Sequence, residues 1–126
     1  MFENLNLSRK DLGDKHEQLA CEILSNNGLK IVTQNYRCKL GEIDIVARDK
    51  ENLVFIEVRY RKSDSYGGSL ESVDRKKQER VVRAASHYLQ KHKLTNKISC
   101  RFDVFAVTGN LNQLQHSWIK GAFHSS

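Results

Sequence analysis

Apolar residues recur at helical spacing in two stretches of the chain. The first runs from about Asp11 to Asn27, and Gly28 after it is typical of a helix end. The second runs from Val73 to about Lys91. Both stretches are therefore predicted to form amphipathic helices. Their apolar positions are Leu12, Leu19, Ala20, Ile23 and Leu24 in the first and Val81, Val82, Ala85, Tyr88 and Leu89 in the second.

Four further stretches are rich in β-branched and aromatic residues, which is typical of strands. They cover about residues 29–33, 41–48, 53–60 and 101–108. The predicted order of elements is therefore α-β-β-β-α-β. This order favours an α/β fold in which helices flank a mixed sheet.

Turns, a loop and a tail make up the rest. Residues 49–52 are predicted to form a hairpin turn, and the polar stretch 63–72 a loop. The tail after Leu111 gives no clear element, although its few apolar residues suit packing against the domain. A length of 126 residues fits one domain. We expect a single domain over residues 1–126, with a core of about 11–108 and a tail of 109–126.

Alternation along the predicted hairpin brings two acidic residues together. Residues two apart on a strand share a face, so Glu57 and Arg59 point the same way. A turn that closes between Arg48 and Leu53 sets an antiparallel register in which position 44 pairs with 57 and 42 with 59. Asp44 then lies directly opposite Glu57. Because two like charges across a strand pair are destabilising, the pattern predicts a compensating divalent cation such as Mg²⁺.

The same residues also allow a purely structural interpretation. Glu57 could pair with Arg59 or Lys39, and Asp44 with Arg101, since ion-pair networks are common. Glu17 borders the apolar face of the first predicted helix and suits a third carboxylate reaching the site. A glutamate at such a boundary is, however, usually a solvated side chain. The residues alone leave both interpretations open.

The formal net charge of +6 is concentrated in one segment. Between Arg59 and Lys93 there are ten Lys or Arg against four acids, and the rest of the chain holds eleven of each. This pattern is typical of a surface that binds a polyanion, although it also fits a solvated helix face. The residues expected to contact nucleic-acid phosphates are Arg61, Lys62, Lys76, Arg80 and Arg83.

The sequence disfavours membrane and secreted classes. No apolar run approaches the roughly 18 to 20 residues that cross a bilayer, and the N-terminal residues lack the order of a secretion signal. Cys21, Cys38 and Cys100 lack the short paired spacings of zinc sites and disulfide scaffolds. We expect a cytoplasmic protein without a membrane partner.

Four short motifs are spread over the chain. They are G-x-x-x-E-x-x-A at 13–20, N-x-R-x-x-x-G-E-I-D-I-V-A at 35–47, F-I-E-V-R-Y-R at 55–61 and R-F-D-V at 101–104. Together they resemble the YraN family of bacterial proteins, over about residues 11–108. The resemblance implies a restriction-endonuclease-like fold of the PD-(D/E)xK type, similar to Holliday-junction resolvases. It also implies that Asp44, Glu57 and Glu17 are metal ligands of a nuclease.

At one position the sequence departs from that pattern. The usual lysine two residues after the glutamate is Arg59 here. Lysine can handle protons or position water, whereas arginine stays charged and keeps only an electrostatic role. Lys62 or Lys76, which lie nearby in the sequence, could take the place of the missing lysine. Because related nucleases place a Gln or Lys from the second helix beside the site, Gln78 is an expected accessory residue, with a buried glutamine capping backbone as the alternative.

The leading hypothesis is a DNA endonuclease that hydrolyses phosphodiester bonds with Mg²⁺ or Mn²⁺. Its expected catalytic residues are Asp44, Glu57, Arg59 and Gln78. Similarity to the junction-cutting enzymes implies branched DNA as a substrate and a homodimer as the assembly. Two alternatives stay open: a nucleic-acid-binding module of the same fold that has lost catalysis, and a protein-interaction domain with a basic helix.

Overall fold

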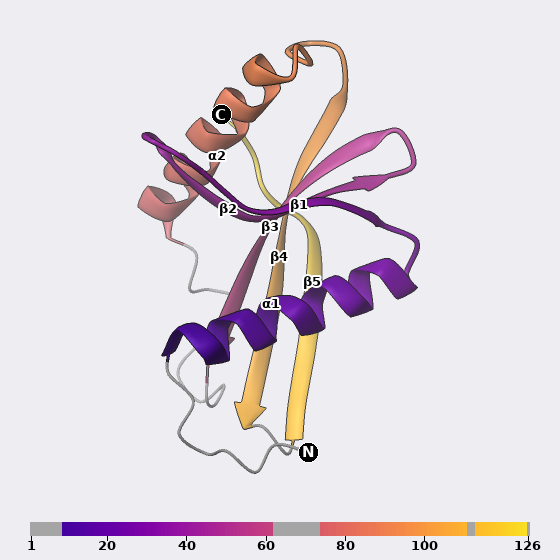
Figure 1. Ribbon diagram of the computed structural model, residues 1–126, viewed down its shortest axis with the longest axis vertical. Coiled ribbons are helices and arrows are strands. Elements are labelled where there is room, and N and C mark those ends of the chain that lie inside the picture. Colours follow the sequence, from indigo (N-terminus) through magenta and orange to yellow (C-terminus); the bar gives the residue numbers. More distant parts are fainter. Residues whose placement is uncertain (1–8, 62–73, 111–112, 126) are drawn as a thin grey trace.

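The computed structural model describes residues 9–61, 74–110 and 113–125, with side chains from Lys15 onward. The predicted α-β-β-β-α-β order is confirmed, and a fifth strand follows it (Figure 1). The expected loop over residues 63–72 lies outside the described residues. None of the described helices is long and apolar enough to span a membrane. The elements are α1 (Arg9–Asn26), β1 (Lys30–Cys38), β2 (Gly41–Asp49), β3 (Asn52–Arg61), α2 (Arg75–Lys91), β4 (Ser99–Asn110) and β5 (Gln113–Phe123).

The strands form one mixed sheet in the order β1-β2-β3-β4-β5. The β1–β2, β2–β3 and β4–β5 pairs are antiparallel, and the β3–β4 pair is parallel. A parallel pair needs a crossover connection, and α2 lies in the connection between β3 and β4. This mixed α/β arrangement is consistent with the restriction-endonuclease-like core that the sequence predicts.

Two strands extend beyond the sequence-based expectations. β1 continues to Cys38 instead of ending at Thr33, and both Tyr36 and Cys38 pack against the core. β5 occupies most of the tail because a fully buried carboxylate on β4 holds it. That carboxylate, Asp103, accepts hydrogen bonds from Trp118 Nε1 and from the backbone N–H of Gly121, both at 2.9 Å.

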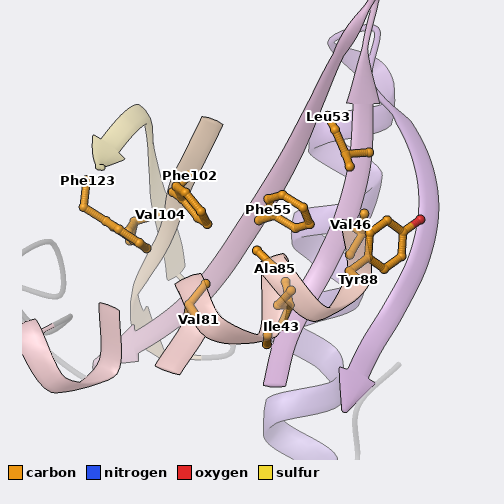
Figure 2. Packing of buried hydrophobic residues seen from close by; sticks show 11 residues of the cluster. Ile43, Val46, Leu53, Phe55, Val81, Ala85, Tyr88, Phe102, Val104 and Phe123 are labelled. Atoms are coloured by element: carbon orange, nitrogen blue, oxygen red, sulfur yellow. The ribbon is translucent and has the colours of Figure 1, made fainter. Parts of the chain in front are cut away.

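The two helices cover opposite faces of the sheet. On one face, Val81 of α2 belongs to the same buried cluster as Phe55 of β3 (Figure 2). On the other, Leu24 of α1 belongs to the same cluster as Ile56 of β3. Strand β3 is therefore buried on both sides, and a charged side chain on it, such as Glu57, is placed in the interior of the protein.

Helix α2 comes very close to the start of β2 at Gly41. A Cβ atom at this position would lie 2.5 Å from the backbone oxygen of Arg80, so only glycine fits there without a shift. The helix begins after Asp74, whose side chain accepts a hydrogen bond of 2.8 Å from the backbone N–H of Lys77. The cap fixes where α2 begins, and the absence of a side chain at Gly41 allows the helix to approach the sheet closely.

Candidate functional site

The β2–β3 ladder follows the expected register over most of its length and then stops. Pairs run from Asp49–Asn52 to Ile45–Ile56, and the extrapolated pairs 44–57 and 42–59 are not part of the ladder. The extrapolation was wrong because it assumes straight strands that stay in contact. Beyond Ile45, a hydrogen bond to a side chain links the two strands. The Asp44 Oδ2 accepts it, at 2.8 Å, from the backbone N–H of Val58.

The side-chain alternation of β2 changes at the same point. Regular alternation would put Ile43 and Ile45 on one face, yet Ile43 packs in the α2-side cluster and Ile45 in the α1-side cluster. Asp44 lies between the two. The side chains on either side of Asp44 therefore enter different halves of the core, at the position where the ladder ends.

A cavity of about 180 Å³ lies at this point. Four elements contribute to it, namely α1, β2, β3 and α2. The structure thus brings Glu17, Asp44, Glu57 and Arg59 into one cavity, although they come from three separate parts of the sequence. The lining residues are His16, Glu17, Asp44, Glu57, Val58, Arg59, Tyr60 and Lys77.

Glu57 is almost fully buried, with 1% of its surface exposed. Burial, and then the negative charge of Asp44, raise the pKa of Glu57 to about 8, against the opposing effect of the cations Lys77 and Arg59. One of its oxygens, Oε1, is buried without a hydrogen-bond partner among the described residues. A buried carboxylate oxygen of this kind is costly unless a further group satisfies it.

Asp44 shows the same tendency to a smaller extent. Burial raises the pKa of Asp44, while the hydrogen bond from Val58 and the charge of Lys77 lower it. The charge of Asp44 in turn raises the pKa of Glu57, so the two carboxylates interact. A cation between them would offset both effects.

Lys77 is the lining residue that the sequence analysis missed. Its Nζ lies 3.4 Å from Oε2 of Glu57. Lys76, one of the two substitutes considered, is exposed and does not line the cavity, and Lys62 lies outside the described residues. The signal was present in the sequence, because Lys77 precedes Val81 by four residues and so extends the buried stripe of α2.

Gln78 is not brought to this cavity. It lines a separate groove beside α2 together with Arg75, Val82, Arg83 and Phe123. Lys77 and Gln78 line different hollows because adjacent helical positions point about 100° apart. The helix does contribute to the cavity, through Lys77.

The ion pairs that the structure shows differ from those that the structural interpretation expected. Arg101 pairs with Asp49 at 2.9 Å and with Asp103 at 3.1 Å, and not with Asp44. Glu57 does have an ion-pair partner, but this partner is Lys77 on α2.

His16 and Tyr60 form the remaining wall of the cavity. His16 is buried and stacks on Tyr60, with the ring centroids 4.0 Å apart and the planes 16° apart. No role was assigned to either residue from the sequence. His16 precedes Ala20 by four residues, so helical periodicity alone places it on the buried face of α1.

Most of the basic residues expected to contact phosphates lie on the surface. Lys76, Arg80 and Arg83 are exposed on α2, and Arg61 is exposed at the end of β3. Lys62 is not among the described residues. The exposed guanidinium and ammonium groups are thus available to a polyanion.

The carboxylates suit a hard cation in number and in chemistry. No three His, Cys, Asp or Glu side chains form a complete ligand cluster within the described ranges. Mg²⁺, however, typically takes only one or two protein carboxylates and keeps several waters. Asp44 and Glu57 supply two, Glu17 lines the same cavity, and the buried Oε1 of Glu57 provides an oxygen that a cation would satisfy.

Comparison with known proteins places the chain among bacterial relatives of similar length. The model of a family described as "Uncharacterised protein family UPF0102" matches residues 16–107, a range that includes Glu17, Asp44, Glu57 and Lys77. A UPF0102 protein of Aeromonas hydrophila is 46% identical over 123 residues, which cover 97% of this chain and 92% of the relative.

Two further UPF0102 proteins show similar agreement. That of Alcanivorax borkumensis is 44% identical over 119 residues, covering 94% of this chain and 95% of the relative. That of Nitrosococcus oceani is 42% identical over 116 residues, which cover 92% of this chain and 94% of the relative. The matched range also contains the central motifs that resemble the YraN proteins, which confirms that resemblance. Because family model and relatives alike span most of the chain, the protein belongs to the UPF0102 family.

Proposed function

We propose that the protein is a Mg²⁺-dependent DNA endonuclease whose active site is the carboxylate cavity. The observation that carries the proposal is Glu57, which is 1% exposed, lies close enough to Asp44 for their charges to interact, and has one oxygen without a hydrogen-bond partner among the described residues. Such an arrangement is destabilising by itself, and a bound divalent cation would relieve it.

The cation would be held by Asp44 and Glu57, and Glu17 of α1 lines the same cavity. Bound there, Mg²⁺ would stabilise the negative charge that develops on the phosphate oxygens and lower the pKa of the attacking water. Mn²⁺ has similar oxygen preferences and would occupy the same site.

The protein's own cations would act beside the carboxylates. Arg59 and Lys77 both line the cavity, so they would bind the substrate phosphate and stabilise charge on it. The positive charge that related nucleases carry two residues after the glutamate is present here as Arg59, and α2 adds an amine in the form of Lys77. Although arginine stands in place of the usual lysine, the cavity has both a guanidinium, from Arg59, and an amine, from Lys77.

DNA is the substrate that the surface charge favours. Lys76, Arg80 and Arg83 are exposed on the helix that also supplies Lys77. Contacts to phosphates from these residues would position DNA without reading its sequence. A DNA substrate also favours a cytoplasmic location, and the homodimer implied by the junction-cutting enzymes stays a prediction.

A metal-binding experiment and a cleavage experiment test the proposal together. Mg²⁺ should raise the melting temperature of the wild-type protein, and Asp44→Asn or Glu57→Gln should remove this shift. The wild-type protein with Mg²⁺ should cut at least one form among branched, single-stranded and duplex DNA. Binding of DNA without cleavage of any form would instead favour a binding module of the same fold, and absence of DNA binding would favour a protein-interaction domain.

A further inference from the structure

Tyr60 presents an aromatic ring at the wall of the carboxylate cavity. The residue is 37% exposed, although it lines the cavity together with Glu57 and Arg59. The other large apolar residues exposed in the described part of the chain are the aliphatic Val32 and Leu40. An aromatic ring beside a proposed phosphodiesterase site offers an apolar, flat surface to a group of the substrate.

Two contacts hold this ring in place. One of its faces stacks on His16, which is 3% exposed, with 4.0 Å between the centroids. Its hydroxyl donates a hydrogen bond of 2.7 Å to the backbone oxygen of Gly109 on β4. Because one face and the hydroxyl are engaged, a further flat group would have to meet the opposite face or the edge of the ring. A ring fixed in this way loses little conformational freedom when another flat group stacks on it.

We propose that Tyr60 is a stacking platform for an unpaired nucleobase next to the phosphate that the cavity binds. Aromatic side chains stack on any base, because every base has a π face, so the platform would select unpaired structure and not sequence. A base within continuous duplex already has both faces covered by its neighbours and must be unstacked first. This inference rests on the proposed nuclease function and specifies its substrate class as DNA with an unpaired nucleotide at the cutting site.

The position of Tyr60 supports this arrangement. It follows Glu57 by three residues on β3, and it lies against His16 of α1, whereas Lys77 reaches the cavity from α2. His16, which backs the Tyr60 ring, and Lys77 therefore come from helices on opposite faces of the sheet. Because Tyr60 lines the same cavity as Lys77 and Arg59, its ring is within reach of a nucleoside attached to a phosphate that these cations bind.

Fluorescence of 2-aminopurine, an adenine analogue that is quenched by stacking, tests the platform directly. A single-stranded oligonucleotide carrying the analogue is titrated with protein in Ca²⁺ instead of Mg²⁺, and a gel confirms that it stays intact. Wild-type protein and Tyr60→Phe should quench the analogue. Tyr60→Leu and Tyr60→Ala should lose the quenching and bind about tenfold or more weakly.

Controls separate the loss of stacking from the loss of folding. Tyr60→Leu keeps an apolar side chain over His16, so it remains informative if Tyr60→Ala is unstable, and the melting temperature is measured for each variant. Leu40→Ala, at an exposed position in the turn after β1, should behave as the wild-type protein. The analogue placed inside a continuous duplex should show little change in fluorescence.

The outcomes for the platform and for the nuclease are distinct. Equal quenching and affinity for wild type and Tyr60→Leu, or no quenching by wild type, would overturn the platform, whether or not Mg²⁺ supports cleavage. Quenching that depends on Tyr60 without cleavage in Mg²⁺ would support the platform and contradict the nuclease. Equal binding to single-stranded and duplex DNA would overturn the proposed preference for unpaired bases.

Discussion

Lys77 Nζ lies 3.4 Å from Oε2 of Glu57, so the second helix contributes an amine to the carboxylate cavity. Only a minor part of the lysine side chain is exposed, and the glutamate is buried. This contact joins the crossover helix α2 to β3, a strand that is buried on both faces. It also provides the lysine that the sequence pattern lacks at position 59.

Replacing Lys77 should therefore affect both stability and cleavage. Lys77→Met would remove a cation that lowers the pKa of Glu57, so the buried carboxyl would stay protonated to a higher pH and would destabilise the fold only as it ionises. We expect a loss of stability that grows above pH 8, and little or no cleavage. Urea denaturation and a cleavage assay measure the two effects.

Two further variants control this result. Lys97→Met removes an exposed lysine after α2 and should change neither property. Arg59→Lys keeps a cation at its position and should change the cleavage rate little, because Lys77 already supplies an amine. A large increase in cleavage by Arg59→Lys, together with no effect of Lys77→Met, would show that Lys77 is not the functional lysine.

The raised pKa of Glu57 predicts an unusual pH dependence of the metal-free protein. Its pKa is about 8 in the folded protein against the ordinary 4.5, so the folded state binds a proton more tightly than the unfolded state. The stabilisation that this tighter proton binding gives the folded state is complete below about pH 4.5 and is lost as the pH rises through about 8. The free energy of unfolding should therefore decrease between these limits.

Glu57→Gln isolates this contribution, because the amide does not titrate. The buried His16 acts in the opposite direction, since burial lowers the pKa of its imidazole and protonation at low pH then destabilises the fold. His16 is present in both proteins, so its effect cancels when the two are compared. The free energy of unfolding of wild type minus that of Glu57→Gln, measured by urea denaturation in EDTA at several pH values, should therefore decrease as the pH rises. A difference that is constant over the range would contradict the raised pKa.

The central residues of the site could be predicted because strand alternation and a short turn are local properties. Asp44, Glu57 and Arg59 follow from these rules and meet in the cavity. The paired register does not extend to Asp44, because extrapolation cannot show where twisted strands part. Lys77 was missed in favour of Gln78 because the choice depends on how α2 docks on the sheet, which is a tertiary property.

The fold shows the same division between local and long-range information. Both helices follow from the periodicity of their apolar residues, and the four expected strands follow from their β-branched and aromatic residues. The fifth strand depends on Asp103, which binds Trp118 and Gly121 across a separation of fifteen residues or more. Nothing within the tail itself predicts these hydrogen bonds.

Gly41 should be intolerant of even the smallest side chain. In Gly41→Ala the new Cβ would lie 2.5 Å from the backbone oxygen of Arg80, so α2 would have to move away from β2. Overpacking of this kind typically costs about 1–3 kcal/mol. The shift would also displace Lys77, one turn earlier in the helix.

Urea denaturation and the Mg²⁺-dependent cleavage rate check both consequences of Gly41→Ala. We expect a lower midpoint of unfolding and slower cleavage under conditions in which the variant is still folded. A variant as stable and as active as wild type would show that α2 can retreat freely and that its close approach does not position Lys77.

The exposed basic face of α2 should determine the salt dependence of DNA binding. Changing Lys76, Arg80 and Arg83 to alanine should make the slope of log K against log salt shallower, by roughly 0.9 for each duplex phosphate that the variant no longer neutralises. A matched triple variant, with alanine at the exposed Lys30, Lys39 and Lys97, removes the same charge elsewhere. Equal slopes for the two triple variants would remove α2 from the DNA-binding surface.

The most direct test of the carboxylate cavity is single-turnover cleavage with Mg²⁺ by wild type, Asp44→Asn and Glu57→Gln. The substrates are labelled branched, single-stranded and duplex DNA, with EDTA as the blank and Glu51→Gln, at an exposed turn position, as the matched control. Wild type and the control should cut at the same rate, and both cavity variants should lose activity while remaining folded. Cleavage that persists in Glu57→Gln, or its absence in wild type with every substrate, would contradict the proposed nuclease site.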